Sequence, residues 1–233
     1  MMPPMREPPG QTLLVDADDT LWENEAHFRH VWAWFLDRME SRGHERDHAL
    51  DTLRAVERAR CARFGYGALN FALSIVDAVA DMEGHPCPKD LEEAIHAQKD
   101  WILDRPVEPF PRVDATLADL KQRHRLIIVT KGVVDEQSAK IERSGLAHHF
   151  EAAEVVAEKD IAHYTDVIER HGIDLATGWM IGNSPKSDIN RSRAAGLKTV
   201  FIPHRTIWEL EREPFPEPPG YTLERFHQLL DHF

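Results

Sequence analysis

Apolar positions near the start of the chain indicate one strand followed by a long helical region. Thr12–Val15 is a short apolar run that stops at Asp16, which is typical of a buried strand ending at a polar site. Apolar residues then recur at helical spacing and predict four helices, over Trp22–Met39, Ala49–Ala62, Leu69–Met82 and Lys89–Leu103. This region carries no strand pattern.

Beyond Pro106 the pattern changes to strands alternating with helices. The expected strands are Leu126–Val129, Glu154–Val156, Trp179–Ile181 and Thr199–Ile202. The expected helices are Val113–Arg123, a segment reaching Arg143, Ile161–Arg170 and a segment closed by Gly196. Alternation of this kind needs right-handed crossovers and therefore predicts a mainly parallel sheet with helices on both faces.

The simplest fold class that accounts for this pattern is α/β, with a Rossmann-like, mainly parallel sheet as the core and an inserted all-helical domain. We assign residues 1–20 and 107–233 to the core and residues 21–106 to the insertion, a candidate cap. The proline-rich stretch Arg212–Gly220 predicts a surface loop. After it, four apolar residues predict a final amphipathic helix: Leu223, Phe226, Leu229 and Leu230.

Net charge and cysteine content indicate which classes of partner and which cellular compartment to expect. The 233 residues carry a formal net charge of −12, which repels polyphosphate backbones, so we expect no nucleic acid polymer as partner. Cys61 and Cys87 have neither metal-ligand spacing nor the density of a disulfide scaffold, which fits a reducing cytosol. Met1–Gly10 lacks the apolar core of a signal peptide, and no window is long enough to cross a bilayer. We expect a cytoplasmic protein with no membrane partner, as a monomer or homodimer.

Polar side chains gather where the predicted strands end. In an open parallel sheet, ligands bind outside the carboxyl ends of the strands. Four polar groups fall there, one after each successive strand: Asp16 and Asp18, then Thr130 and Lys131, then Lys159, then Gly182–Asp188. Chance would rarely deliver three carboxylates, a hydroxyl and an ammonium to one edge, so the combination predicts a catalytic site.

These residues resemble the motifs of the haloacid dehalogenase superfamily, in its phosphatase form with a small helical (C1-type) cap. The opening motif reads Asp16-Ala17-Asp18-Asp19-Thr20, and Thr130 and Lys159 match the second and third motifs. The fourth reads Gly182-Asn183-Ser184-Pro185-Lys186-Ser187-Asp188. The resemblance covers nearly the whole chain, because the predicted insertion lies where the family places its cap.

The resemblance implies a reaction and a role for each residue. Asp16 attacks phosphorus and is transiently phosphorylated, while Asp18 protonates the leaving oxygen and then activates water. Thr130 and Lys159 hold the transferring phosphoryl group, and Lys131 joins them as a phosphate-binding candidate. The metal is Mg²⁺, held by Asp16, the main-chain carbonyl of Asp18, and Asp188. The implied substrate is a small phosphorylated metabolite.

The chemistry of the residues agrees with this implied reaction. A phosphate dianion repels a carboxylate nucleophile, so cations must neutralise its oxygens, and hard oxygen ligands select Mg²⁺. Asp18 could act as an acid only if its pKa is raised, which we expect from neighbouring negative charge. Asn183 departs from the Asp usual at its position, which predicts weaker Mg²⁺ binding, although the amide can still orient a metal-bound water. Ser184 and Pro185 predict a helix cap and first turn.

Several residues have two interpretations. Arg63 and Tyr66 lie in the distinctive stretch Arg60–Asn70 and are candidates for contact with substrate, while an inter-helix turn explains the stretch equally well. Adjacent His148 and His149 are expected to point to different faces, so we assign them no site.

The function also has alternatives. A 2-haloacid dehalogenase would use the Asp nucleophile without metal, but the presence of Asp18 and Asp188 favours phosphate. A mutase would transfer the phosphoryl group to another substrate hydroxyl. A catalytically idle binding protein could share the fold, with Asn183 as its only support in the sequence.

Overall fold

The structure, a computed structural model, describes residues 6–233; the start of the proline-rich segment, residues 1–5, lies outside the described residues. Internal contacts divide the chain into two compact units. The first, here called the α/β unit, comprises Met1–Glu25 and Val107–Phe233, and the second, the helical unit, comprises Ala26–Pro106. The first break therefore follows Glu25, later than the boundary at residue 20 expected from the sequence.

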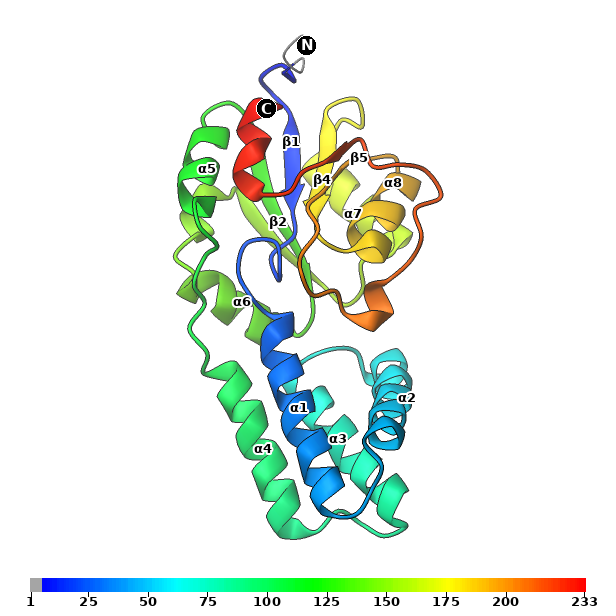
Figure 1. Ribbon diagram of the computed structural model, residues 1–233. Coiled ribbons are helices and arrows are strands. Elements are labelled where there is room, and N and C mark those ends of the chain that lie inside the picture. Colours follow the sequence, from blue (N-terminus) through cyan, green and yellow to red (C-terminus); the bar gives the residue numbers. More distant parts are fainter. Residues whose placement is uncertain (1–5) are drawn as a thin grey trace. The chain divides into compact units, whose positions relative to one another are not determined.

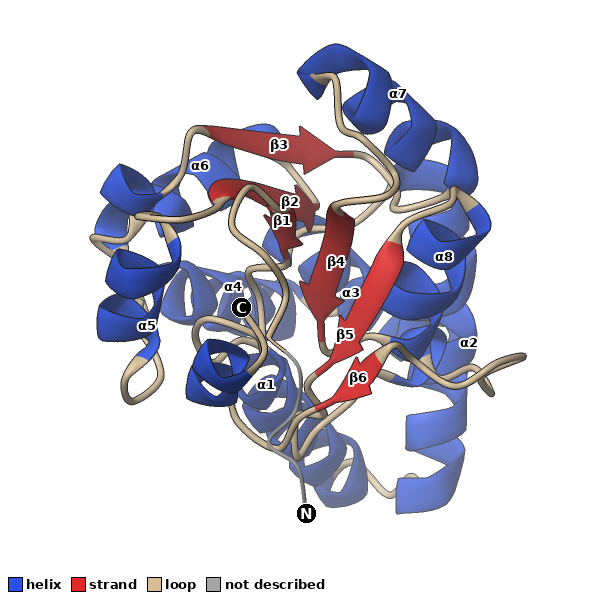
Figure 2. Cartoon of the chain, turned by 90° about the horizontal axis from the view of Figure 1, so that it is seen from above, coloured by secondary structure: helices blue, strands red, loops and turns tan. Residues whose placement is uncertain are grey.

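The α/β unit is built on one six-stranded parallel sheet (Figure 2). Its strands are β1 (Thr12–Val15), β2 (Arg125–Lys131), β3 (Ala152–Val156), β4 (Gly178–Gly182), β5 (Lys198–Phe201) and β6 (Tyr221–Thr222). Their spatial order is β3-β2-β1-β4-β5-β6, and every pairing is parallel. The predicted fold class is confirmed, and the central strand is the one that leads to Asp16.

Helices cover both faces of this sheet. They are α5 (Val113–Leu120), α6 (Val134–Arg143), α7 (Ile161–His171) and the short α8 (Ser192–Ala194). Side chains of β1 alternate between two apolar clusters, since Leu13 and Val15 pack with Leu117 of α5, whereas Leu14 packs with Val167 of α7. The central strand is therefore buried on both sides, as its uninterrupted apolar run predicted.

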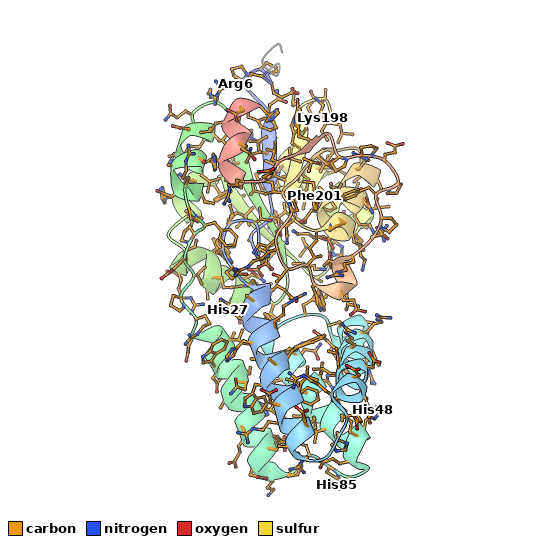
Figure 3. All side chains as sticks on the ribbon, viewed as in Figure 1. Arg6, His27, His48, His85, Lys198 and Phe201 are labelled. Carbon is orange, nitrogen blue, oxygen red and sulfur yellow. The ribbon has the colours of Figure 1, made fainter. Side chains whose placement is uncertain are left out.

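The C-terminal region differs from the prediction in two ways. The chain forms a sixth strand, in which Tyr221 pairs with Val200, and then a 3₁₀ turn over Phe226–Asp231 in place of an amphipathic α-helix. Phe226 and Leu229 are both buried, because residues three apart lie on the same side of a 3₁₀ helix. The apolar spacing thus identified the buried side chains but not the type of helix. Figure 3 shows Lys198 and Phe201 at the two ends of the neighbouring strand β5.

The helix predicted to end at Gly196 is also irregular. It begins as a π-helical segment over Pro185–Arg191 and continues as α8. Ser184 caps it as predicted, accepting a hydrogen bond from the Ser187 backbone N–H at 3.0 Å. π-Helical turns occur often at functional sites, and this one carries Asp188.

The helical unit contains the four predicted helices (Figure 1). They are α1 (Glu25–Ser41), α2 (Arg46–Phe64), α3 (Ala68–Glu83) and α4 (Lys89–Leu103). Their apolar faces meet in one core that includes Phe35, Leu53, Ile75 and Ile95, all fully buried. Across residues 6–233, no helix has both the length and the apolar character needed to cross a membrane.

Candidate active site

Two buried carboxylates and one buried ammonium form the centre of the site. β1 pairs with β4, with Val15 beside Ile181, so Asp16 and the loop carrying Asp188 leave the sheet at the same edge. The Lys159 Nζ atom bonds to Asp16 Oδ1 and lies 2.8 Å from Asp188 Oδ1. All three side chains are buried, so segments far apart in sequence supply one compact charged cluster.

This cluster has more negative than positive charge. The pKa of Asp16 is raised to about 7, mainly by burial and also by repulsion from Asp188, while Lys159 and Thr20 partly oppose the rise. Burial disfavours the charge on Lys159, but Asp16 and Asp188 together raise its pKa above the ordinary value. One ammonium serves two carboxylates here, which leaves the cluster able to accept a further cation.

The donor set fits Mg²⁺. Asp188 Oδ2 accepts a hydrogen bond from the Ser184 backbone N–H at 2.9 Å, which orients the carboxylate. A Cβ atom at Gly182 would overlap this carboxylate, so the position requires glycine. Buried carboxylate oxygens at short range are the hard ligands that Mg²⁺ prefers. Asn183 is buried, and its Oδ1 atom lies 3.4 Å from Thr20 Oγ1, which places the amide beside the carboxylates.

Thr20 positions the predicted nucleophile. Its hydroxyl donates to Asp16 Oδ2 at 2.7 Å, while Lys159 bonds to the other oxygen. The chain turns sharply between Asp16 and Thr20, because Asp19 has a positive φ of 60°. The Asp19 carboxylate accepts backbone N–H groups of Asn24 and Glu25 at 2.8 and 3.0 Å, which ties this loop to the beginning of α1.

The electrostatic environment of Asp18 is opposite to that of Asp16. Burial would raise its pKa, but Lys140, with Gln137 and Trp22, lowers it below the ordinary value. Lys140 Nζ lies 2.7 and 2.5 Å from the two carboxylate oxygens, while Gln137 Nε2 and Trp22 Nε1 donate at 3.0 and 2.8 Å. The expectation of a raised pKa at Asp18 was wrong, because the charge of Lys140 on α6 and the hydrogen bonds to the carboxylate outweigh the effect of burial. The raised pKa values belong instead to Asp16, at about 7, and to Asp19, at about 8, and burial is the main cause of both.

Comparison with known proteins decides the family. The model of the haloacid dehalogenase-like hydrolases matches residues 11–196, which include all four groups of polar residues. The chain belongs to this family of hydrolases. The resemblance noted from the motifs is therefore confirmed.

Individual relatives differ in how much they share with this haloacid dehalogenase-like hydrolase. The phosphoserine phosphatase of Thermus thermophilus is 30% identical over 99 residues, 40% of each chain. The glyceraldehyde 3-phosphate phosphatase of Methanothermobacter thermautotrophicus is 30% identical over 113 residues, 46% of this chain and 50% of that protein. The chain thus matches half or less of either phosphatase. A haloacid dehalogenase-like hydrolase from Xanthomonas campestris has a similar structure, with a TM-score of 0.78, 30% identity and coverage of 93% of this chain and 92% of that one.

Thr130 and Lys131 end β2 beside the nucleophile loop of the hydrolase. Val15 pairs with Ile128, so both residues lie at the edge where β1 delivers Asp16. Thr130 is buried. Lys131 forms an ion pair with Glu211 and lies 3.5 Å from Glu158. Burial opposes the charge on Lys131, but these two carboxylates raise its pKa above the ordinary value. Its charge is already balanced, and its phosphate-binding role stays a prediction.

Arg63 and Tyr66 belong to the helical unit. Arg63 lies in the last turn of α2 and is exposed, with its guanidinium 4.8 Å from the Phe64 ring centroid. Tyr66 lies half-buried between Gly65 and Gly67, both with positive φ, in the turn to α3. The turn is therefore real, and substrate contact by either residue stays a prediction.

Sequence reasoning missed several residues that bond to the predicted site. Gln137 and Lys140 lie three apart on α6, which places both on one helix face toward Asp18. Glu211, in a short 3₁₀ turn, bonds to Lys131 and Ser184. The spacing of Gln137 and Lys140 was a usable signal, whereas nothing local distinguished Glu211, which directly precedes the predicted loop Arg212–Gly220.

Proposed function

We propose that this hydrolase is a Mg²⁺-dependent phosphatase that cleaves a small organic phosphate monoester through an aspartyl-phosphate on Asp16. The observation that carries the proposal is the buried cluster of Asp16, Asp188 and Lys159. It combines a nucleophile, a second carboxylate suited to a divalent cation and a fixed positive charge for phosphate oxygens. The names of the two curated phosphatases support phosphate as the substrate class.

In the first half-reaction, an Asp16 oxygen forms a bond to phosphorus as the bond to the alcohol oxygen breaks. Thr20 and Lys159 orient the two Asp16 oxygens before attack. Asp18 gives a proton to the departing alcohol. Because Lys140 keeps Asp18 ionised in the observed arrangement, Asp18 must separate from Lys140 to carry that proton. When bound, Mg²⁺ supplies charge neutralisation at the phosphate oxygens.

In the second half-reaction, water attacks the phosphorus of the aspartyl-phosphate and Asp16 is released as a carboxylate. Asp18 accepts the proton of this water, and its ionised state beside Lys140 suits that role. Thr130, Lys159 and Lys131 are the proposed phosphate-binding residues. Inorganic phosphate is the product.

The proposal extends to the partners and the location. We propose a small phosphorylated metabolite as the substrate, no nucleic acid or membrane partner, and a monomer or homodimer in the cytoplasm. The net charge of −12 supports the absence of nucleic acid. Cys61 and Cys87, both within the described chain, form no disulfide, which agrees with a reducing compartment.

Dehalogenation of a 2-haloacid is the alternative, since the family name includes it. That chemistry needs a carboxylate nucleophile but no cation. Asp188 is buried and shares Lys159 with Asp16, and a dehalogenase would have no use for this second carboxylate. Phosphate hydrolysis therefore accounts for more of the site.

Release of inorganic phosphate from a panel of esters tests the proposal. The panel contains p-nitrophenyl phosphate, phosphoserine and glyceraldehyde 3-phosphate, each assayed with Mg²⁺ or with EDTA. Asp16→Asn should lower the rate of Mg²⁺-dependent phosphate release by a factor of about 10³ or more. Asp119→Asn, the same change at an exposed helix position, should leave release unchanged.

A parallel assay measures chloride released from 2-chloropropionate. Chloride release without phosphate release would overturn the proposal in favour of a dehalogenase. Phosphate release that survives EDTA or Asp16→Asn would overturn the mechanism. Turnover of neither substrate class would favour the idle binding protein.

A further inference from the structure

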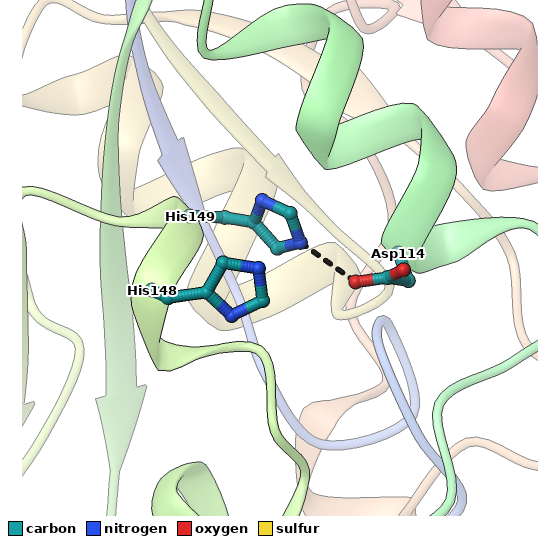
Figure 4. Close-up of side chains that lie close together, drawn as sticks. All are labelled: Asp114, His148 and His149. Carbon is teal, nitrogen blue, oxygen red and sulfur yellow. Dashed lines mark hydrogen bonds and ion pairs between the residues drawn. The ribbon is translucent and has the colours of Figure 1, made fainter.

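A second group of potential metal ligands lies apart from the predicted catalytic residues. Asp114, His148 and His149 each offer one ligand atom, and these atoms lie within 4.8 Å of one another (Figure 4). Asp114 is in the first turn of α5, and the two histidines lie in the turn that is separated from β3 by two residues. The predicted catalytic residues instead follow the carboxyl ends of strands, so this cluster belongs to a different part of the α/β unit.

The expectation that His148 and His149 point to different faces was wrong. Both lie in a 3₁₀ turn, Ala147–His149, after which Phe150 is extended. Their ring centroids are 3.8 Å apart at an interplanar angle of 42°. The tight turn, together with the rotation of each ring about its own bonds, brings the adjacent imidazoles together on the side facing Asp114.

The hydrogen bonds favour the protonation states that bind metals. His148 Nδ1 lies 2.8 Å from the Gly145 carbonyl oxygen, which can only accept, so the proton is on Nδ1 and the lone pair is on Nε2. A ligating histidine is commonly held in this way, with its other nitrogen donating to a carbonyl. His148 is therefore oriented as a ligand by its own turn.

His149 and Asp114 supply the other two ligands. His149 Nε2 lies 2.7 Å from Asp114 Oδ1, and the His149 side chain is only 3% exposed. Its Nδ1 atom is buried without a hydrogen-bond partner among the described residues. A cation bound at Nε2 would replace the proton shared with Asp114, and the neutral ring would then carry its proton on Nδ1.

We propose that Asp114, His148 and His149 form a transition-metal site that takes Zn²⁺. Two imidazole nitrogens and one carboxylate oxygen form a three-ligand set typical of Zn²⁺, whereas Mg²⁺ prefers oxygen alone. The Asp114 side chain is 67% exposed and His148 is exposed, so water can complete the coordination. The bound ion would link the start of α5 to the turn before β3. The inference does not depend on the proposed phosphatase activity.

Binding of Co²⁺ to the full chain, followed by its visible absorption, tests this site because nitrogen-ligated Co²⁺ absorbs more strongly than Co²⁺ held by oxygen. Excess Mg²⁺ is present to occupy oxygen-rich sites. Asp114→Asn and His148→Ala change exposed residues and should preserve the fold. His85→Ala is the matched control, since His85 (Figure 3) also lies near a carboxylate, 3.4 Å from Glu83, but belongs to no group of three potential metal ligands among the described residues.

We expect wild type and His85→Ala to bind one equivalent of Co²⁺ and to release it to Zn²⁺. The affinity for Co²⁺ should fall at least about tenfold in Asp114→Asn and in His148→Ala, as is typical when a metal site loses a ligand or a residue that orients one. Zn²⁺ should raise the melting temperature of wild type and of His85→Ala but not of these two variants.

Equal binding by wild type and both variants would overturn the proposal, as would no binding up to about 1 mM Co²⁺, near the weak limit of specific affinity. A second group, Asp19, Glu23 and His204, has its ligand atoms within the same 4.8 Å. A signal lost in His204→Ala and kept in His148→Ala would assign the metal to that group instead.

Discussion

The interiors of the two units differ in how much polar surface they bury. Among the described residues, the helical unit has only two polar or charged residues that are buried as whole residues, Glu57 and Ser74. The α/β unit buries many, including both carboxylates and the lysine of the predicted site. Ser74 donates to the Asn70 carbonyl oxygen of its own helix at 2.8 Å, so it needs no partner from elsewhere in the fold.

This contrast separates chemistry from packing. A buried charge is costly unless another group pairs with it, so the charges of the α/β unit depend on one another across distant segments. The helical unit depends mainly on apolar volume. Substitutions of the charged residues buried in the first unit should therefore alter electrostatics and catalysis together, while those in the apolar core of the second should alter stability alone.

The largest effect is expected for Lys159→Met. It leaves Asp16 and Asp188 buried without their shared cation, which should lower the free energy of unfolding by about 4–5 kcal/mol, as for other broken buried pairs. Added Mg²⁺ should restore part of the loss, because a divalent cation can serve both carboxylates. Urea unfolding with Mg²⁺ or with EDTA measures this. Stability equal to wild type in EDTA would contradict the proposed cluster.

Ile75→Ala tests the helical unit. Ile75 is fully buried in its apolar core, so its truncation should lower the free energy of unfolding by about 3–4 kcal/mol through lost burial and a cavity. The control Leu69→Ala removes a similar side chain that is 51% exposed and should cost less than about 1 kcal/mol. Turnover per folded molecule should stay near wild type in both, and a large loss of turnover in Ile75→Ala would break the separation of packing from chemistry.

His124 tests the burial of neutral polar groups in the α/β unit. Burial, with Arg123 and Arg6, lowers its pKa from 6.5 to about 4. Between these values the unfolded chain holds the proton and the folded chain does not, so stability should fall as pH falls from about 6.5 to 4, by on the order of 2–3 kcal/mol. Denaturation midpoints across this range should depend less steeply on pH in His124→Asn than in the wild type.

The smallest effect is expected for Lys140→Met. Lys140 holds Asp18 ionised, but Gln137 and Trp22 would still position the carboxylate. We expect kcat for phosphate ester hydrolysis to fall about tenfold, which corresponds to about 1.4 kcal/mol, with little change in stability. Steady-state kinetics beside Lys121→Met, a change at a lysine on the protein surface, measures the effect. An unchanged kcat would show that Asp18 acts independently of Lys140.

Local sequence signals predicted the elements whose apolar positions follow a clear strand or helix pattern. β1 was expected at Thr12–Val15 and has those bounds, and α4 was likewise expected at Lys89–Leu103. β6 was missed because two residues beside a proline-rich loop carry no alternation, and only pairing with β5 makes them a strand. Short elements of this kind depend on their neighbours more than on their own sequence.

The sequence by itself determined the family, the parallel α/β core and the edge of the sheet at which Asp16, Lys159 and Asp188 gather. Motif spacing and apolar periodicity are local properties, and strand ends in a parallel sheet necessarily share one edge. Only the tertiary structure decided that Lys140 lowers the pKa of Asp18, that Glu211 balances Lys131 and that His148 and His149 face Asp114. These pairings join residues from different elements at a few ångströms, and at that range side-chain direction and burial determine which charges meet.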